Sequence, residues 1–525
     1  MAEPQQDRTI EFLSTPQAWG LPDGTKVERI DTHGAAVFLV GERVYKLKRA
    51  VSFPFMDFST LERRQRFCAD EVRLNRRTAP DLYLGLVPVL RDGDQLRLGE
   101  LRQPDEATTD CVDWLVAMRR FDQDRLMARL AERGELPAAL IGRLAEAIAD
   151  FHAQAQPEPG HGGGQVLAHT VRMDTEQMLA RGDLLDAALS EELARLMPAE
   201  AARVAKAADR RRGCGAVRRC HGDLHLKNIF LDGDDPLPFD GIEFNDRLSC
   251  IDTLYDLSFL LMDLDFRGLR GHANLALNRY LWRSAEKDED LLAGLALLKI
   301  YLARRASIRA HVDAAGVPHI KDRAEADRQR QQARAYQRYA RALFDETGPL
   351  MVCVGGLSGT GKTTIAMALA PELHPTPGAA VLRSDVLRKR MAGVKLDQRM
   401  PAGWYTKENS TAVYEEMHRL ARIALAAGRS VVLDGVYARA EERAAAERVA
   451  REAGCAFAGL WLEAPADLLR ARVAARQGDA SDATPAVVER QRNYDLGAIG
   501  WTRIDASHDS AEVARRARAA IETGT

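Results

Sequence analysis

The chain has 525 residues, of which 46% are hydrophobic and 29% charged, and its formal net charge is -2. This length is too great for one hydrophobic core, and the balanced charge excludes a dedicated nucleic-acid coat or membrane-surface protein. The 7 cysteines are scattered without a Cys-x-x-Cys pair, which is typical of a reducing cytoplasm. We expect a cytoplasmic protein without a signal peptide or a membrane span, because the first residues have no apolar core and the longest apolar stretch, 291–303, is too short.

The first predicted feature is a set of β-strands. Residues 27–49 alternate between apolar and polar side chains and contain turn residues, as a β-hairpin does. Lys46 and Lys48 are two positions apart, so their side chains point to the same face of a strand. Either one of them binds nucleotide phosphates, or both are solvated lysines of an edge strand. Further strands are predicted at 87–90, 95–98 and 111–121, and helices at 61–75, at 126–152 and from about 174 to 212.

A catalytic motif follows at 219–231, where the chain reads His-Gly-Asp-x-x-x-x-Asn within apolar surroundings. It contains Asp223 and, five positions later, Asn228; Asp240 follows after an apolar strand. ATP-dependent phosphoryl transfer needs a carboxylate for the acceptor hydroxyl and hard oxygen ligands for Mg²⁺. We therefore predict that Asp223 is the catalytic base and that Asn228 and Asp240 are metal ligands.

This block resembles the catalytic loop of the aminoglycoside phosphotransferase and choline kinase branch of the protein-kinase-like fold, where His-Gly-Asp replaces the His-Arg-Asp of protein kinases. The resemblance implies an α+β domain over residues 1–340. Its small lobe, at about 1–118, would cover ATP, and its large lobe would span about 119–340.

The same resemblance implies roles for individual residues. Glu71, on the helix predicted at 61–75, is expected to orient the phosphate-binding lysine, for which Lys46 is slightly favoured over Lys48. Asp256 matches the aspartate of a Tyr-Asp-Leu motif in that branch and is expected to brace the catalytic loop by hydrogen bonds. The Gly-x-Gly-x-x-Gly loop of protein kinases is absent, and only Gly34 occupies the expected turn.

The segment 321–344 is rich in arginine, glutamine and alanine and has few apolar residues. Its helix propensity is high, so we interpret it as the last helix of the first domain and as a connector. A basic contact with nucleic acid is the alternative.

A second nucleotide motif begins with a buried strand at 350–355. The pattern Gly-x-x-x-x-Gly-Lys-Thr follows this strand and precedes a predicted helix, which is the context of a Walker A loop. Backbone amides and the helix N-terminus would hold the phosphates, Lys362 would contact the terminal ones, and the Thr363 hydroxyl would bind Mg²⁺. The predicted nucleotide-binding residues of this loop are Gly356, Leu357, Ser358, Gly359, Thr360, Gly361, Lys362, Thr363 and Thr364.

Downstream, an acidic residue follows each of two further strands. This arrangement resembles gluconate kinase, chloramphenicol phosphotransferase and the kinase part of polynucleotide kinases. By that resemblance Asp385 would activate the acceptor hydroxyl and Asp434 would lie near the metal, although either can instead cap a helix. The helix at 468–476 resembles the arginine-bearing lid of such kinases, and Arg472 and Arg476 share one of its faces as candidate catalytic residues.

The order of the two motifs resembles a bacterial family of two-domain proteins, with an aminoglycoside phosphotransferase-like half and a P-loop kinase half at 341–525. We predict a bifunctional kinase in which each half uses MgATP to phosphorylate a hydroxyl group of a small molecule, such as a sugar, an amino sugar or an aminoglycoside-like compound. Two alternatives remain open: the P-loop half is an ATPase that regulates the first half, or the acceptor is a nucleic-acid end.

Overall fold

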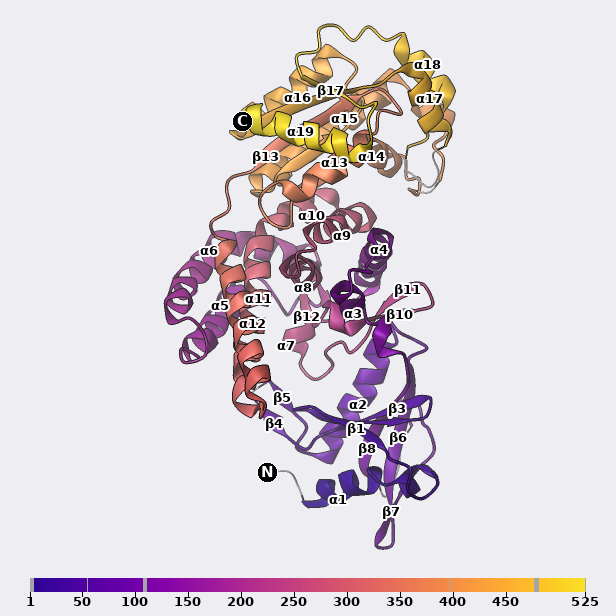
Figure 1. Cartoon of the computed structure of the whole chain (residues 1–525), viewed down its shortest axis with the longest axis vertical. Coiled ribbons are helices and arrows are strands. Elements are labelled where there is room, and N and C mark those ends of the chain that lie inside the picture. Colours follow the sequence, from indigo (N-terminus) through magenta and orange to yellow (C-terminus); the bar gives the residue numbers. More distant parts are fainter. Residues whose placement is uncertain (1–3, 54, 107–110, 397, 476–480, 525) are drawn as a thin grey trace. The chain divides into compact units, whose positions relative to one another are not determined.

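In the computed structural model, which describes residues 4–53, 55–106, 111–396, 398–475 and 481–524, the chain divides into two units. Figure 1 labels the helices and strands along the chain. Unit 1 comprises Met1–His161 and Val217–Phe259, and unit 2 comprises Gly162–Ala216 and Leu260–Thr525. Both units are discontinuous in sequence. The division into domains at 1–340 and 341–525 stays a prediction, because its boundary lies inside unit 2 and separates segments that pack together there.

The main sheet of unit 1 is antiparallel, with the strand order β1-β2-β3-β8-β6-β7. The alternating sequence predicted to form a hairpin supplies its first strands. Residues Lys46 and Val116 are direct neighbours on β3 and β8, in the middle of the sheet. Its strands are β1 (Glu28–Asp31), β2 (Ala35–Val40), β3 (Arg43–Lys48), β6 (Tyr83–Asp92), β7 (Gln95–Leu98) and β8 (Cys111–Arg119).

Helix α2 (Leu61–Asn75) packs on one face of this sheet and matches the predicted helix at 61–75. The Thr60 side chain caps it by accepting a hydrogen bond from the N–H of Arg63, which satisfies one amide of the first turn. Its buried residues Cys68 and Val72 share a core with Trp114 of β8. This packing holds α2 against β8, the neighbour of strand β3, which carries both candidate lysines.

The rest of unit 1 surrounds the predicted catalytic motif. That motif lies between β9 (Val217–Arg219) and β10 (Ile229–Asp232), and Asp240 comes just after β11 (Asp235–Pro238), which pairs with β10 as a hairpin. Helix α8 (Thr253–Phe266) begins in unit 1 and ends in unit 2. Unit 1 also contains α1 (Pro4–Leu13), β4 (Ser52–Phe53), β5 (Met56–Asp57), α3 (Met127–Glu132), α4 (Ala138–Gln154), α7 (Asp246–Ser249) and β12 (Cys250–Asp252).

Unit 2 begins with helices, and a 3-10 turn at Leu295–Leu297 lies between α10 (Asp288–Gly294) and α11 (Leu298–Gly316). The arginine-rich segment 321–344 forms a helix, as predicted. Its buried Gln337 donates hydrogen bonds to the Asp186 carbonyl (2.8 Å) and to Ser190 Oγ (2.7 Å), so this helix is packed into the unit. The helices before the P-loop are α5 (Gly164–Leu179), α6 (Ala187–Gly213), α9 (Arg270–Arg283), α10 (Asp288–Gly294), α11 (Leu298–Gly316) and α12 (Arg323–Ala342).

The C-terminal sheet of unit 2 is parallel, with the order β14-β15-β13-β16-β17, which confirms the α/β part of the predicted fold. Helices α13 and α19 bury an aliphatic core against one face of this sheet. The strands are β13 (Leu350–Gly356), β14 (Ala380–Arg383), β15 (Val431–Asp434), β16 (Ala456–Glu463) and β17 (Thr502–Asp505). The helices are α13 (Lys362–Leu369), α14 (Ser384–Met391), α15 (Lys407–Ala426), α16 (Ala440–Ala453), α17 (Ala466–Ala474), α18 (Pro485–Arg492) and α19 (Ser510–Gly524).

None of the helices in the described ranges combines the length and the apolarity that crossing a bilayer requires.

One close contact in this sheet gives a stability prediction. A Cβ atom added to Gly459 would lie 2.4 Å from Cγ of the buried Trp501 ring. Gly459→Ala should therefore lower the free energy of unfolding by about 2 kcal/mol, the usual effect of overpacking a core. Gly271→Ala is the matched control, because nothing lies within 4 Å of its added Cβ. Urea denaturation of both variants checks this, and equal stabilities would contradict it.

Candidate functional site

The first candidate site lies in unit 1 and centres on Lys46. Its Nζ atom is 2.9 Å from Glu71 Oε1 and 2.8 Å from Asp240 Oδ1, so three of the predicted site residues meet. Burial opposes the charge of Lys46, but Asp240 and Glu71 outweigh it and raise the pKa of this lysine well above its ordinary value. The Lys46 side chain keeps 19% of its surface exposed and Asp240 keeps 47%, so a ligand has access to both.

Lys48 lies deeper in the same charge network. Its Nζ atom is 2.5 Å from Glu71 Oε2 and also forms an ion pair with Glu243, and the residue is only 1% exposed. Burial alone would raise the pKa of Glu71, yet the two lysines bring it down to about 2. Glu71 therefore joins a partly exposed lysine and a buried one, and the two lysines that the sequence could not separate have different surroundings.

The predicted catalytic loop brings Asp223 and Asn228 into contact. Asn228 Nδ2 donates hydrogen bonds to Asp223 Oδ2 (2.8 Å) and to the Asp223 carbonyl (3.0 Å), which hold the carboxylate in one orientation. His225 Nε2 lies 3.4 Å from the same carboxylate oxygen. The Asp223 side chain keeps 37% of its surface exposed, as a base that must reach an acceptor requires.

Two buried side chains hold this loop in place. Asp256, which is fully buried, accepts hydrogen bonds from the amides of His221 (3.1 Å) and Gly222 (2.8 Å), as predicted. His152 Nε2 lies 3.1 Å from the same carboxylate. His221 Nε2 lies 3.0 Å from the Phe239 carbonyl oxygen, and His221 Nδ1 accepts a hydrogen bond from the Asp223 amide at 3.3 Å. These contacts tie the loop to the residue directly before Asp240.

Asp240 adopts an unusual backbone conformation, with φ = 59°, which costs a non-glycine residue of the order of 1 kcal/mol. Its amide donates to the Tyr83 hydroxyl at 3.0 Å, and the next amide, that of Gly241, donates to Asn75 Oδ1 at 2.7 Å. These contacts maintain the turn and aim the carboxylate at Lys46. Oxygen donors beside a lysine are a set that suits Mg²⁺ and the phosphates it accompanies.

The second candidate site is the P-loop of unit 2. A Cβ atom on Gly356 or Gly359 would lie 2.6 Å from the carbonyl oxygen of Leu462 or Leu469, so the loop follows a path that only glycine permits. Gly361 directly precedes α13, which begins at Lys362. The loop thus ends at a helix N-terminus, and this cradle fits the phosphate groups of a nucleotide.

Other predicted residues of the loop form hydrogen bonds within the loop or with helix α18. Lys362 Nζ donates to the Leu357 carbonyl at 3.1 Å, and Thr360 Oγ1 donates to the same carbonyl at 2.8 Å. The amide of Ser358 donates to Gln491 Oε1 of α18 at 2.8 Å. Thr364, in the first turn of α13, is exposed.

The predicted metal ligands of the P-loop unit lie next to each other. Thr363 Oγ1 donates to Asp434 Oδ2 at 2.5 Å, and Arg383 contacts both: its Nη2 is 3.2 Å from Thr363 Oγ1 and its Nε is 3.4 Å from Asp434 Oδ2. Burial raises the pKa of Asp434, while Arg383 and Lys362 oppose this rise. A hydroxyl and a carboxylate at the end of a phosphate loop form a donor set that fits Mg²⁺.

Asp385 and Arg472 lie at different parts of the P-loop unit. Asp385 is in the first turn of α14, near Arg388 and Tyr405. Burial raises the pKa of Tyr405, and the negative charges of Asp482 and Asp385 raise it further. The Arg388 guanidinium lies 5.3 Å from the centre of the Tyr405 ring. Arg472 Nη1 donates to the Ala506 carbonyl at 2.8 Å, which ties α17 to the loop after β17. Its lid role stays a prediction, and Arg476 lies outside the described residues.

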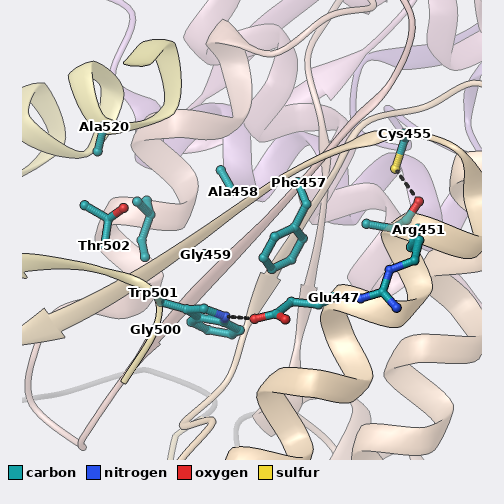
Figure 2. A pocket seen from close by; sticks show the side chains of 12 residues that line it. Glu447, Arg451, Cys455, Phe457, Ala458, Gly459, Gly500, Trp501, Thr502 and Ala520 are labelled. Atoms are coloured by element: carbon teal, nitrogen blue, oxygen red, sulfur yellow. Dashed lines mark hydrogen bonds between the residues drawn. The ribbon is translucent and has the colours of Figure 1, made fainter. Parts of the chain in front are cut away.

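Unit 2 also contains a pocket of about 510 Å³, which Figure 2 shows. It is formed around the first half of β16, whereas the P-loop follows the carboxyl end of β13. Figure 2 shows Trp501 and Glu447 on its wall, where Trp501 Nε1 donates to Glu447 Oε1 at 2.9 Å. We do not place the chemistry of the P-loop in this pocket.

Sequence reasoning missed two residues that contact these sites. Glu243 stands three positions after Asp240, and Arg383 stands two positions before Asp385, so both adjoin residues that were singled out. Their charge was the available signal. Their partners come from distant parts of the chain, which a local motif does not reveal.

Comparison with known proteins adds a family and several similarities. Residues 351–494 match the family described as AAA domain, which agrees with the P-loop geometry. An uncharacterized protein of Mycobacterium tuberculosis is 30% identical over 511 residues, covering 95% of each chain. The adenylyl-sulfate kinase of Myxococcus xanthus is 30% identical over 118 residues, 22% of this chain and 59% of that protein.

Among solved structures, a choline/ethanolamine kinase family protein from Mesorhizobium loti matches 64% of this chain and 99% of its own, with 14% identity and a TM-score of 0.33. Fold similarity at this level does not determine function, which depends on the residues of each site.

Proposed function

The chain belongs to the same family as the uncharacterized protein of Mycobacterium tuberculosis, and we propose that it is a bifunctional ATP-dependent phosphotransferase. Each unit contains one nucleotide site. Each site transfers the γ-phosphoryl group of ATP to a hydroxyl group of a small molecule, such as a sugar, an amino sugar or an aminoglycoside-like compound.

The observation that carries the proposal is the charge network around Lys46 in unit 1. In this proposal Lys46, held by Glu71 at 2.9 Å, binds the phosphates, and Asp240 and Asn228 bind Mg²⁺. When bound, Mg²⁺ neutralises the charge that develops on the transferred phosphoryl group. Asp223, held by Asn228, accepts the proton of the acceptor hydroxyl.

The P-loop of unit 2 supports a second site with a different construction. Its glycines allow backbone amides to approach the phosphates, Lys362 contacts the terminal phosphates, and Thr363 with Asp434 holds the metal. Asp385 activates the second acceptor, with Arg388 beside it. Arg472 and Arg476 are assigned to a lid by their resemblance to small P-loop kinases, and the contact of Arg472 with the Ala506 carbonyl requires that helix to move if the lid closes.

The test is MgATP-dependent phosphate transfer to a panel of sugars, amino sugars, aminoglycosides, nucleosides, 5′-hydroxyl oligonucleotides and adenylyl sulfate. Adenylyl sulfate is included because the relative from Myxococcus xanthus is an adenylyl-sulfate kinase. The wild type is compared with Asp240→Ala, in unit 1, and Lys362→Ala, in the P-loop. We expect each variant to lose a different product by at least about 100-fold, since each removes a group that contacts the phosphates or the metal.

Three results would contradict the proposal in different ways. No transfer to any acceptor, with ATP hydrolysis in its place, would favour an ATPase. Loss of the same product in both variants would favour a regulatory P-loop unit that controls one active site. Transfer confined to oligonucleotides, with strong salt dependence of binding, would favour a nucleic-acid end as the acceptor.

A further inference from the structure

Helix α9 makes a strand-like contact with β14, the edge strand of the P-loop sheet. Asn274, Asn278 and Trp282 are spaced four positions apart, so they lie along one face of α9. The amide of Val381 donates to Asn278 Oδ1 at 2.7 Å, and the Val381 carbonyl accepts from Trp282 Nε1 at 2.8 Å. The Ala379 carbonyl accepts from both asparagines, at 3.0 and 3.1 Å.

This contact satisfies backbone groups on the side of β14 that faces away from its neighbour β15. Exposed edge strands usually bind another strand or are covered by other means, and here amide and indole side chains of a helix bind the edge. Asn274 and Asn278 are fully buried, so a lost hydrogen bond would leave a buried polar group without compensation. Helix α9 therefore fixes the position of β14.

The last residue of β14 is Arg383, which links this helix contact to the P-loop. The Arg383 guanidinium lies 5.3 Å from the centre of the Trp282 ring, within the range of a cation–π interaction. On its other side it contacts Thr363 Oγ1 at 3.2 Å and Asp434 Oδ2 at 3.4 Å. Arg383 is only 7% exposed, so both sets of contacts are shielded from water.

The contact between Arg383 and Thr363 determines how the threonine hydroxyl is oriented. A hydroxyl has one proton to donate and two lone pairs that accept. Thr363 donates its proton to Asp434 and accepts from Arg383, so these two contacts use one lone pair and leave the other for a metal ion. Without Arg383, the hydroxyl can rotate into orientations that do not present this lone pair.

We propose that Arg383 is a positioning residue for the metal and nucleotide site of the P-loop, and that α9 holds it in place through Trp282. This inference rests on the proposed function of the P-loop unit. It makes the helix at 270–283, which the sequence assigned to the first domain, a necessary part of the second site. Groups that hold metal ligands in place typically change metal affinity by about 10- to 100-fold when they are removed.

The experiment measures the dissociation constant of mant-ATP by fluorescence, once in excess MgCl₂ and once in EDTA. The constant in EDTA divided by the constant in MgCl₂ is the gain in affinity due to Mg²⁺. All proteins are full-length and carry Asp240→Ala, which removes a predicted metal ligand of unit 1. We expect Arg383→Leu to reduce the gain at least about 10-fold. Trp282→Leu should reduce it about threefold, since it removes a cation–π contact and a hydrogen bond that position the arginine but leaves Arg383 itself beside Thr363 and Asp434.

The matched control is Arg390→Gln, at the same contact between α9 and the P-loop part of unit 2. Arg390 donates to the carbonyls of Leu281, Trp282 and Ser284 and pairs with Asp288, but it contacts neither Thr363 nor Asp434 in the hydrogen bonds and ion pairs of the described residues. We expect its thermal midpoint to fall and its gain in affinity due to Mg²⁺ to stay at the value of the parent protein, which carries Asp240→Ala alone.

The outcomes separate this inference from the proposed function. If the parent protein shows no gain due to Mg²⁺, the proposed function of the P-loop is wrong. If the parent shows the gain and Arg383→Leu retains it, the positioning role is wrong. Should Arg383→Leu fail to fold, the gain measured for Trp282→Leu tests the positioning role instead. An unchanged gain in Trp282→Leu, or an equal reduction in Arg390→Gln, would overturn the proposal.

Discussion

Asp223→Asn should lower the turnover of the unit 1 site about 1000-fold and leave its affinity for MgATP unchanged. General-base catalysis contributes about 100- to 10,000-fold, and an amide cannot accept the proton of the acceptor hydroxyl. Asn228 Nδ2 lies 2.8 Å from Asp223 Oδ2, so the substituted amide can keep its oxygen toward this donor and preserve the loop. Initial rates with the acceptor identified by the panel, together with nucleotide binding, measure the two quantities.

Asp235→Asn provides the control for this substitution. It makes the same chemical change at an exposed position of the β10–β11 hairpin. Its turnover should equal that of the wild type. A comparable fall in both variants would mean that the surface charge of unit 1, and not the base, limits the rate. Retention of activity in Asp223→Asn would remove Asp223 from the mechanism.

Lys48→Met should destabilise unit 1 by about 3–5 kcal/mol. Lys48 is 1% exposed and forms ion pairs with Glu71 and Glu243, so its removal leaves a buried carboxylate without its partner. Breaking one side of a buried ion pair typically has an effect of this size. The double variant Lys48→Met/Glu243→Met should regain most of the lost stability, because Glu71 keeps its contact with Lys46. Urea denaturation checks both expectations.

Lys46→Met is the comparison that separates the two lysines. It should abolish phosphate transfer in unit 1 while changing the free energy of unfolding by only about 1 kcal/mol, since Glu71 keeps Lys48 and the Asp240 side chain is 47% exposed. If Lys48→Met is stable and loses ATP binding instead, Lys48 is the phosphate-binding residue and Lys46 has the structural role.

The contrast between these lysines shows where sequence patterns stop being informative. Alternation along a strand places Lys46 and Lys48 on the same face, and both have the same charge. Their difference arises from Glu243, which stands 195 residues after Lys48 in the chain. A pattern of nearby residues contains no record of that pairing.

Several features were nevertheless determined by the sequence itself. The predicted helix at 61–75 forms as α2 because a capping threonine and its apolar positions are local signals. The Walker A pattern predicts a strand, a loop and a helix, and these form at β13 and α13, because glycine alone permits the path of the loop. The parallel order of the sheet around them agrees with the predicted α/β fold.

The association of α9 with the P-loop sheet was decided only by the tertiary structure. The sequence predicts helices before residue 341 and a separate sheet after it, and places a domain boundary between them. Trp282 and Val381, 99 positions apart, form a hydrogen bond across that boundary. Local propensity and motifs determine which elements form, because they depend on neighbouring residues. Which helix covers the open edge of β14 depends on buried hydrogen bonds between distant residues, and these exist only in the folded chain.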